Sequence, residues 1–372
     1  MTHYLVLSDL HLGHPDALLS HPQALERLEA ELERADALAL NGDLFDLLIA
    51  PLESCVDASR PFFDLVSQHI EQVVYVPGNH DYHFVAHEED RARLAAVSGG
   101  PDQKPFRLQS AEWLLSSLTK GRVEVRAHYP QVEIAGATLI HGHYTDPHLG
   151  GLINRLGARL GRRLAGIQAA SPDLQAADYE ALFAPLTELL YRTAQLPSSR
   201  RTWQSAERAL VYVAGLIRAP ALLRRTLLSW RRNTTQQTDD VTGLDLSVGP
   251  FSLVSPAEAC EAMRQVFANL GLPAGEYLIG HTHVPFAPRR CGPYTVANSG
   301  SWYYGRRHSR HPLYRQLAWP GAALRKEAGH PAELVRLLDD VEEDELRSWL
   351  DGRKAKGRRR LLPGRSRRLA GR

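Results

Sequence analysis

The sequence predicts a layered α/β fold, because short apolar runs of β type alternate with amphipathic helical stretches along most of its length. Polar loop segments follow several of the apolar runs directly, as is typical of the carboxyl ends of parallel strands. The β pattern stops near residue 145 and resumes only near residue 276. The sequence therefore predicts an α/β domain that is interrupted by a helical insertion.

The predicted strands and helices follow from hydrophobic periodicity. The apolar run at 3–8 predicts a buried strand, and Leu25, Leu28 and Leu32 mark one face of a helix over 22–34. Ala135-Gly136 indicates the turn of a hairpin. Further helices are predicted near 57–69 and 339–351, and further strands at 37–40, 72–76, 122–126, 131–135, 138–140, 276–279, 284–288 and 293–297.

These elements divide the chain into four regions. The catalytic domain is predicted over 1–145 and 250–338, the helical insertion over 146–249, a C-terminal helix over 339–352 and a tail over 353–372. Within the insertion, leucines every four residues with arginines between them predict basic amphipathic helices at 151–167 and 205–230. The tail carries ten Lys and Arg and no acid, so it is expected to be disordered, whereas the rest of the chain is net acidic.

Composition and cysteine usage indicate a soluble protein of a reducing compartment. The longest apolar stretch, about 209–217, is far shorter than the roughly 20 residues that span a bilayer. Three cysteines at unrelated spacings predict neither a disulfide framework nor a zinc site. We expect a cytoplasmic protein, with peripheral association at the inner face of the membrane left open. The basic tail either solubilises the chain or attracts anionic lipid headgroups or nucleic acid.

Five short polar segments carry the chemistry, and each follows a predicted strand. They are Ser8-Asp9-Leu10-His11, Asn41-Gly42-Asp43, Gly78-Asn79-His80-Asp81, His141-Gly142-His143 and Gly280-His281-Thr282-His283. One such segment alone is commonly turn chemistry. Five of them indicate a single site, because only a folded sheet brings the loops together. Mixed carboxylates and imidazoles suit Mn, Fe, Zn or Co, and two such cations roughly 4 Å apart can cleave a phosphoester.

The five segments resemble the signature of the calcineurin-like metallophosphoesterases. The resemblance implies a four-layer sandwich of two β-sheets flanked by helices, and two divalent metal ions per chain, Mn first, with Fe, Zn or Co as alternatives. It implies that the first metal is bound by Asp9, His11 and His283, that Asp43 bridges, and that Asn79, His141 and His281 complete the second site. By the same resemblance His80 contacts the phosphate and assists the leaving group, and Asp81 orients His80. Asp46 is expected to support the loop after Asp43 without ligating.

The segments 8–12, 42–46 and 280–285, with the helical insertion, also look like the UDP-2,3-diacylglucosamine hydrolases. Those enzymes cleave a pyrophosphate bond in a nucleotide-linked glycolipid. This resemblance implies a lipid-linked phosphorylated substrate, and we expect His143, Arg155 and Arg159 to contact it. Those hydrolases commonly carry Arg where this chain has His80, and Asp where it has His143.

Other functions therefore stay open. A soluble phosphodiesterase, a nuclease or a phosphomonoesterase uses the same metal ligands, and the arginine-rich helices are equally consistent with a self-packed lid. A non-catalytic scaffold is the third class, against which the complete ligand set argues. The sequence contains no Gly-x-Ser-x-Gly elbow, no P-loop and no dinucleotide-binding glycine motif, which excludes those chemistries.

Overall fold

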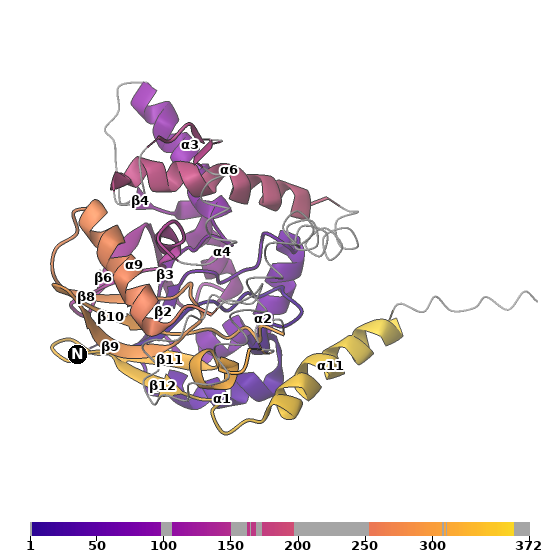
Figure 1. The fold of residues 1–372 in the computed structure, drawn as a ribbon. Coiled ribbons are helices and arrows are strands. Elements are labelled where there is room, and N and C mark those ends of the chain that lie inside the picture. The colour runs from indigo at the N-terminus through magenta and orange to yellow at the C-terminus, as the bar shows by residue number, and fades with distance from the viewer. Residues whose placement is uncertain are drawn as a thin grey trace, which may run out of the picture.

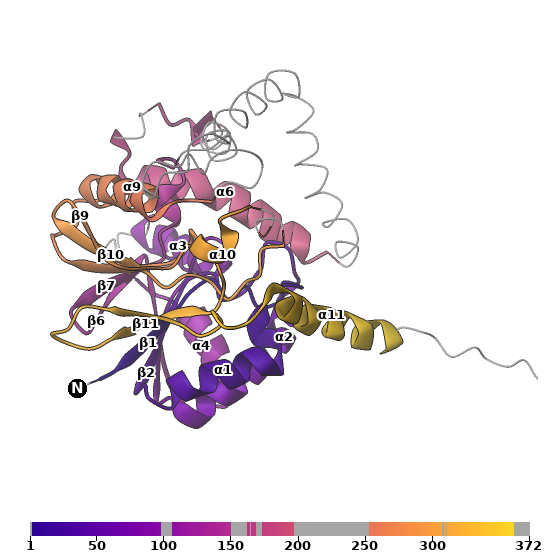
Figure 2. The ribbon, with the colours of Figure 1, turned by 60° about the horizontal axis from the view of Figure 1, so that its bottom comes forward.

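Two β-sheets pack face to face, and helices cover their outer faces (Figure 1). The computed structural model describes residues 2–97, 106–149, 162–163, 165–168, 173–196, 253–306, 309 and 311–360. In Figure 2 the layers follow one another from α9 through the smaller and the larger sheet to α1. The predicted architecture of two sheets flanked by helices is confirmed.

The larger sheet has seven strands in the order β12-β11-β1-β2-β3-β5-β4. Neighbours among β1, β2, β3 and β5 are parallel, whereas β11 runs antiparallel to β1. The first three strands are almost wholly buried, which explains their nearly unbroken apolar sequences. The strands are β1 (Tyr4–Leu7), β2 (Ala37–Asn41), β3 (Gln72–Val76), β4 (Phe106–Arg107), β5 (Glu124–Tyr129), β11 (Ala322–Lys326) and β12 (Glu333–Arg336).

The smaller sheet has five strands in the order β6-β7-β8-β10-β9. Its strands are β6 (Gln131–Ile134), β7 (Ala137–Ile140), β8 (Glu276–Ile279), β9 (Phe286–Cys291) and β10 (Tyr294–Asn298). β7 pairs in parallel with β8, with Ala137 opposite Glu276. The two strands on either side of the predicted insertion are therefore direct neighbours, so both deliver their following loops to the same edge.

An apolar core fills the space between the two sheets. Val6 and Val74 of the larger sheet and Leu139 and Leu278 of the smaller sheet belong to this cluster, and all are buried. Their strands present side chains alternately to this core and to the helices outside. The inter-sheet core therefore fixes which face of each strand points inward. It thereby also fixes where the loop after each strand begins.

Helices on the outer faces complete the layers. α4 contacts α2 and β5 on the outside of the larger sheet, and α9 covers β9 of the smaller one. α9 begins at Pro256 because Ser255 and Glu258 form a capping box, each side chain accepting from the other's backbone N–H. The bounds are α1 (Pro22–Leu32), α2 (Leu52–His69), α4 (Gln109–Leu118) and α9 (Pro256–Asn269).

Two further helices lie side by side at the top of Figure 1. They are α3 (His83–Val97) and α6 (Ala176–Ala194), and α6 lies within the predicted insertion. The His83 ring stacks on Tyr191 at 3.6 Å between ring centroids, and its Nδ1 lies 3.0 Å from Glu188. α6 is thus packed onto the catalytic domain. Most of the predicted helix at 151–167, and the whole of the one at 205–230, lie outside the described residues.

The C-terminal part differs from the prediction in three respects. β11 and β12 were not predicted, although β11 pairs directly with β1. A short helix α10 (Tyr314–Leu317) precedes them. The last helix, α11 (Glu343–Arg360), extends past the predicted end at residue 352, so the first part of the predicted tail is helical. Two 3-10 turns, η1 (Leu18–Ser20) and η2 (His143–Thr145), complete the elements.

The expectation that the cysteines form no disulfide was wrong for two of them. Cys260 of α9 and Cys291 at the end of β9 form a disulfide with 5.5 Å between their Cα atoms. The packing of α9 on β9 brings together two residues that are 31 positions apart. Cys55 is buried and free. The bond therefore staples a helix to the outer face of the smaller sheet.

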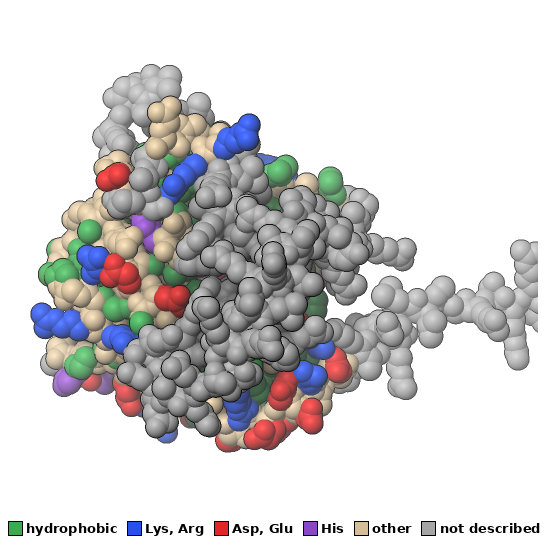
Figure 3. Space-filling view, in the orientation of Figure 1, with side chains coloured by type: hydrophobic (Ala, Val, Ile, Leu, Met, Phe, Trp, Pro, Cys, Tyr) green, Lys and Arg blue, Asp and Glu red, His purple; other side chains and the backbone are tan. Residues whose placement is uncertain are grey.

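Surface features bear on the expected partners only in part. Among the described residues no helix is long and apolar enough to cross a bilayer. On the face shown in Figure 3, the described basic and acidic side chains are interspersed. The basic segments on which a lipid or nucleic-acid partner was predicted lie largely outside the described residues, so that expectation stays a prediction.

A buried ion pair between the sheets leads to a prediction of stability. Lys326 Nζ of β11 donates to Glu276 Oε2 of β8 at 2.7 Å, and Ala332 N donates to the other oxygen at 2.8 Å. Glu276→Ala leaves the buried Lys326 ammonium group with the His330 carbonyl but without its carboxylate, so we expect the free energy of unfolding to fall by about 3 kcal/mol. Urea denaturation followed by circular dichroism measures this loss. Glu133→Ala, on the exposed side of β6, is the control and should stay within about 0.5 kcal/mol of the parent.

Candidate metal centre

The five polar segments converge at one end of the two sheets, as predicted. Asp9, Asp43 and His80 lie just past β1, β2 and β3, and His141 and His281 just past β7 and β8. Because these strands are parallel within each sheet, their carboxyl ends share an edge. Side chains separated by more than 270 positions thereby come within contact distance.

Backbone strain is concentrated at this edge. Of the seven non-glycine residues with positive φ among the described residues, five are predicted ligands: Asp9 (53°), His11 (47°), Asp43 (51°), His281 (65°) and His283 (59°). Left-handed backbone is costly for residues with a Cβ, and it persists where the surrounding structure imposes it for a function. The strain gives evidence for a functional site that is independent of residue type.

The first cluster consists of Asp9, His11 and His283. His283 Nε2 lies 3.1 Å from Asp9 Oδ1 and 3.2 Å from His11 Nε2. The second oxygen of Asp9 accepts from the backbone N–H of His281 at 2.9 Å, which fixes the carboxylate plane. One ligand atom from each of the three residues lies within 4.8 Å of the others, so the cluster can hold one metal ion.

The second cluster consists of Asp43, His141 and His281, whose ligand atoms also lie within 4.8 Å of one another. His141 Nδ1 donates to the Asn41 carbonyl at 2.8 Å, so its other nitrogen is the one available to a metal ion. That Nε2 lies 3.4 Å from Asp43 Oδ1 and has no hydrogen-bond partner although it is buried. Nearby Asn79 Oδ1 is likewise buried without a partner. Such orphaned acceptors are costly unless a cation binds them, and they fit a metal ligand set.

Asp43 lies between the two clusters. Its Oδ1 faces His141 Nε2, whereas its Oδ2 lies 3.9 Å from His11 Nε2. His11 and Asp43 also form a third candidate group with His80. Asp43 accepts the backbone N–H of His80 at 2.8 Å, which holds the carboxylate in place. One oxygen toward each cluster is the arrangement that a bridging carboxylate requires.

The electrostatics favour a bound cation. Burial raises the pKa of Asp43, but the imidazoles of His141 and His80 outweigh it and hold that pKa well below its usual range. Burial likewise disfavours a charged His141, yet Asp43 and Asp9 raise its pKa to about 9. Buried carboxylates thus stay ionised, as the oxygen ligands of a cation must be.

His80 is paired with Asp46. His80 Nδ1 lies 2.8 Å from Asp46 Oδ1, and Asp46 Oδ2 lies 3.5 Å from His11 Nδ1. Burial disfavours the charged imidazole of His80, but Asp46 and Asp43 raise its pKa to about 10. About a quarter of the His80 side chain is exposed, so its second ring nitrogen can meet a substrate. Asp46 therefore orients His80 by a hydrogen bond and lies close to His11, a role that exceeds the predicted loop support.

Asp81 holds the loops together. Its Oδ2 accepts from the Tyr75 hydroxyl at 2.5 Å and from Leu44 N at 2.8 Å, and its Oδ1 accepts from Gly78 N at 2.5 Å. Burial and the charge of Asp43 raise its pKa to about 6. The predicted role of Asp81 in orienting His80 is corrected here, because the carboxylate bonded to His80 Nδ1 is that of Asp46.

The predicted substrate contacts fare differently. His143 is buried, its Nε2 lies 3.3 Å from the Tyr129 hydroxyl and its ring centroid lies 5.7 Å from that of His141, and its contact with substrate stays a prediction. Arg155 and Arg159 lie outside the described residues. Tyr303, which the sequence did not single out, is half-buried, and its ring centroid lies 5.2 Å from that of His11. It forms an aromatic wall of the first cluster.

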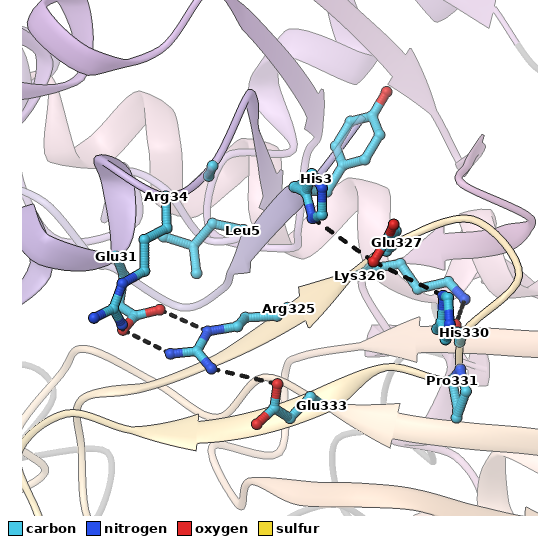
Figure 4. A pocket seen from close by; sticks show the side chains of 12 residues that line it. His3, Leu5, Glu31, Arg34, Arg325, Lys326, Glu327, His330, Pro331 and Glu333 are labelled. Carbon is cyan, nitrogen blue, oxygen red and sulfur yellow. Dashed lines mark hydrogen bonds and ion pairs between the residues drawn. The ribbon is translucent and has the colours of Figure 1, made fainter. Parts of the chain in front are cut away.

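Two other features of the described residues lie away from this edge. A pocket of about 540 Å³ opens where β1 begins, at the end of that strand opposite Asp9 (Figure 4). Its charges are mutually neutralised, since Arg325 donates twice to Glu31 and also pairs with Glu333. The second feature, a group of acids and His69 on α1 and α2, is more exposed than the buried ligand clusters. Neither matches the chemistry of the strand-end site.

The space at Gly78 generates a prediction. A Cβ at this position would lie 2.1 Å from Asp43 Oδ1 and 2.6 Å from His141 Nε2. Gly78→Ala must therefore displace both ligands, and we expect Mn²⁺ binding to weaken by at least roughly tenfold. Equilibrium dialysis with elemental analysis measures this loss. Gly275→Ala, whose Cβ would meet only Tyr277 at 3.8 Å, is the control. Equal metal binding by both variants would contradict the placement of Asp43 and His141.

The comparison with known families accords with this geometry. A family model described as calcineurin-like phosphoesterase matches residues 2–164. No curated protein matches the chain. The match covers four of the five segments, and β8 supplies the remaining ligands, His281 and His283, from beyond it. Residues 2–164 therefore match a calcineurin-like phosphoesterase domain, and this match indicates a hydrolase that acts on phosphoric esters.

Proposed function

We propose that the chain hydrolyses a phosphodiester or pyrophosphate bond at a centre of two divalent metal ions. The position of Asp43 carries this proposal. One of its oxygens faces the cluster of His141 and the other faces the cluster of His11, so a single carboxylate serves both metal positions. Such pairs clamp both sides of an in-line displacement at phosphorus and generate a nucleophilic water.

The ligand set supports a transition metal. Each cluster combines a buried carboxylate with two imidazoles, and imidazole is a poor ligand for Mg²⁺. Asn79, whose Oδ1 is buried without a hydrogen-bond partner, directly follows Gly78, which abuts Asp43 and His141, and would add a neutral oxygen ligand there. We propose Mn²⁺ as the physiological ion, with Fe, Zn and Co as the alternatives that share this chemistry.

His80 supplies the remaining group. Its Nδ1–H is directed at Asp46, which leaves Nε2 as the donor that the partly exposed ring offers to substrate. With Nδ1–H held by Asp46, the ring can donate from Nε2 to the phosphate and protonate a departing oxygen. The ring centroid of His80 lies 4.6 Å from that of His11, which places this donor beside the first metal position.

The insertion is the proposed determinant of substrate. α6 packs on α3, near the sheet edge where the five segments meet. The proposed metal ligands, in contrast, lie in loops that follow strands of the two sheets. A nucleotide-linked lipid such as UDP-2,3-diacylglucosamine is the substrate that the segment pattern favours. A soluble diester or a monoester is the alternative, since His80 replaces the arginine common in the lipid hydrolases.

A substrate comparison tests the proposed function. The Mn²⁺-reconstituted chain is assayed with UDP-2,3-diacylglucosamine in detergent, bis-p-nitrophenyl phosphate and p-nitrophenyl phosphate. We expect the first two to be hydrolysed faster than the monoester. Asp43→Ala is the blank and should lose more than about 1,000-fold in turnover, because it removes a ligand of both clusters. Asp36→Ala, just before β2 at the opposite end of that strand, controls for removing an aspartate. A fastest reaction with the monoester would contradict the proposal.

The role of His80 predicts a dependence on the leaving group. His80→Ala should keep both metals and lose on the order of 100-fold or more in kcat with a diester whose leaving group is an alkyl alcohol. With p-nitrophenolate, which needs no proton to depart, the loss should be at least tenfold smaller. Steady-state assays with a matched pair of methyl and p-nitrophenyl diesters measure this difference. Equal losses with the two leaving groups would remove the acid role.

A further inference from the structure

Asp146 contacts the second cluster from a loop rather than from a strand end. Its Oδ1 lies 2.7 Å from His281 Nε2. About a third of the Asp146 side chain is exposed, whereas His281 is largely buried. Asp146 is also the first residue of the predicted insertion. The contact therefore joins the start of the insertion to a ligand that follows β8.

The local backbone delivers Asp146 to this place. Gly142 has a φ of 110°, which reverses the chain immediately after His141. Its carbonyl accepts from Thr145 N at 3.0 Å and from Thr145 Oγ1 at 2.7 Å, and His143 O accepts from Asp146 N at 3.2 Å. This closed turn brings the Asp146 carboxylate to the Nε2 atom of His281.

The turn is anchored from beneath by α6. The Tyr144 hydroxyl donates to Glu180 of α6, and the Tyr129 hydroxyl lies 2.8 Å from that of Tyr144. Glu180 also accepts from Tyr82 at 2.9 Å. These groups are buried, so their hydrogen bonds are strong and directional. The position of Asp146 is thus fixed by packing and is more than a chance surface contact.

The contact leaves one ring nitrogen of His281 for a metal. With Nε2–H donated to Asp146, the lone pair is on Nδ1. One ring nitrogen of His281 lies within 4.8 Å of the ligand atoms of Asp43 and His141, and Asp146 is not a member of that group. A histidine that binds a metal with one nitrogen commonly donates the other N–H to a carboxylate, which fixes its tautomer and orientation.

We propose that Asp146 is a positioning residue of the second metal site, holding His281 in the Nε2–H tautomer with Nδ1 free for the ion. This inference rests on the proposed function in requiring that a metal bind at Asp43, His141 and His281. It assigns a role to the insertion in addition to substrate choice, because the insertion's first residue completes the support of a ligand. Loss of the carboxylate should weaken the second site and leave the first unchanged.

Metal titration of four full-length proteins tests the proposal. The parent, Asp146→Ala, Asp146→Asn and Asp173→Asn are stripped with chelator and titrated with Mn²⁺ by isothermal calorimetry. We expect Asp146→Ala to weaken one of the two sites by roughly 10- to 100-fold and to leave the other within about twofold. Asp146→Asn keeps an oxygen acceptor for Nε2–H and should lose less. Asp173→Asn, an exposed aspartate of the same insertion, should match the parent.

Each alternative result is decisive. Parent-like binding at both sites in Asp146→Ala would overturn the proposal, and so would a metal-bound crystal structure with an Asp146 oxygen at about 2.1 Å from the ion, which would make it a ligand. A parent that binds no metal would instead refute the proposed function. Should Asp146→Ala fail to fold, ¹⁵N spectra of the metal-free parent and Asp146→Asn decide the matter. The proposal expects the Nε2–H tautomer of His281 in the parent, and its absence there overturns the proposal.

Discussion

The side chain of Asn41 joins the two sheets at the point on which the whole site depends. Its Nδ2 donates to the carbonyls of Leu278 at 3.0 Å and Ile140 at 3.3 Å, which belong to β8 and β7 of the smaller sheet. The backbone carbonyl of Asn41 accepts from His141 Nδ1 and so fixes the tautomer of that ring. The metal ligands come from both sheets, so their separation is set by how closely the carboxyl ends of those sheets approach. A buried amide that spans this gap fixes the approach through directional bonds, which apolar packing alone cannot supply.

Forming this site costs free energy of folding, which favourable packing elsewhere in the protein must offset. Ionised carboxylates are buried beside one another, and several ligands occupy left-handed backbone. The offset comes from two apolar cores, one between the sheets and one beneath the helices. Two further carboxylates hold the site in place. Asp81 accepts hydrogen bonds from loop backbone, and Asp46 orients the imidazole of His80. Carboxylates in adjacent loops thus have different structural roles, because each one accepts hydrogen bonds from different donors.

The sequence predicted that the five polar segments come together because each one follows a strong apolar strand, and a strand end is a local signal. It missed β11 and β12, because β11 pairs with β1 from the opposite end of the chain and β12 pairs with β11, and such long-range pairing leaves no local signal. The disulfide was missed for the same reason, since it depends on where α9 packs. The identity of the carboxylate beside His80 could not be read from spacing, because Asp46 reaches it from another loop. Asp146 carried no signal at all, being an ordinary turn residue until His281 is placed beside it.

The parallel pairing of β7 with β8 has a consequence for how such a chain can diversify. The polypeptide leaves the smaller sheet at one strand and re-enters it at the adjacent one, so everything between is a closed excursion whose ends are already held together. Doubling the length of such an excursion costs only about 0.6 kcal/mol of closure entropy. Lengthening it between α6 and α9 therefore costs the rest of the fold little in stability. The parts that cannot be exchanged freely are its first turn, where Asp146 contacts His281, and the helices α6 and α9, which pack on α3 and on β9.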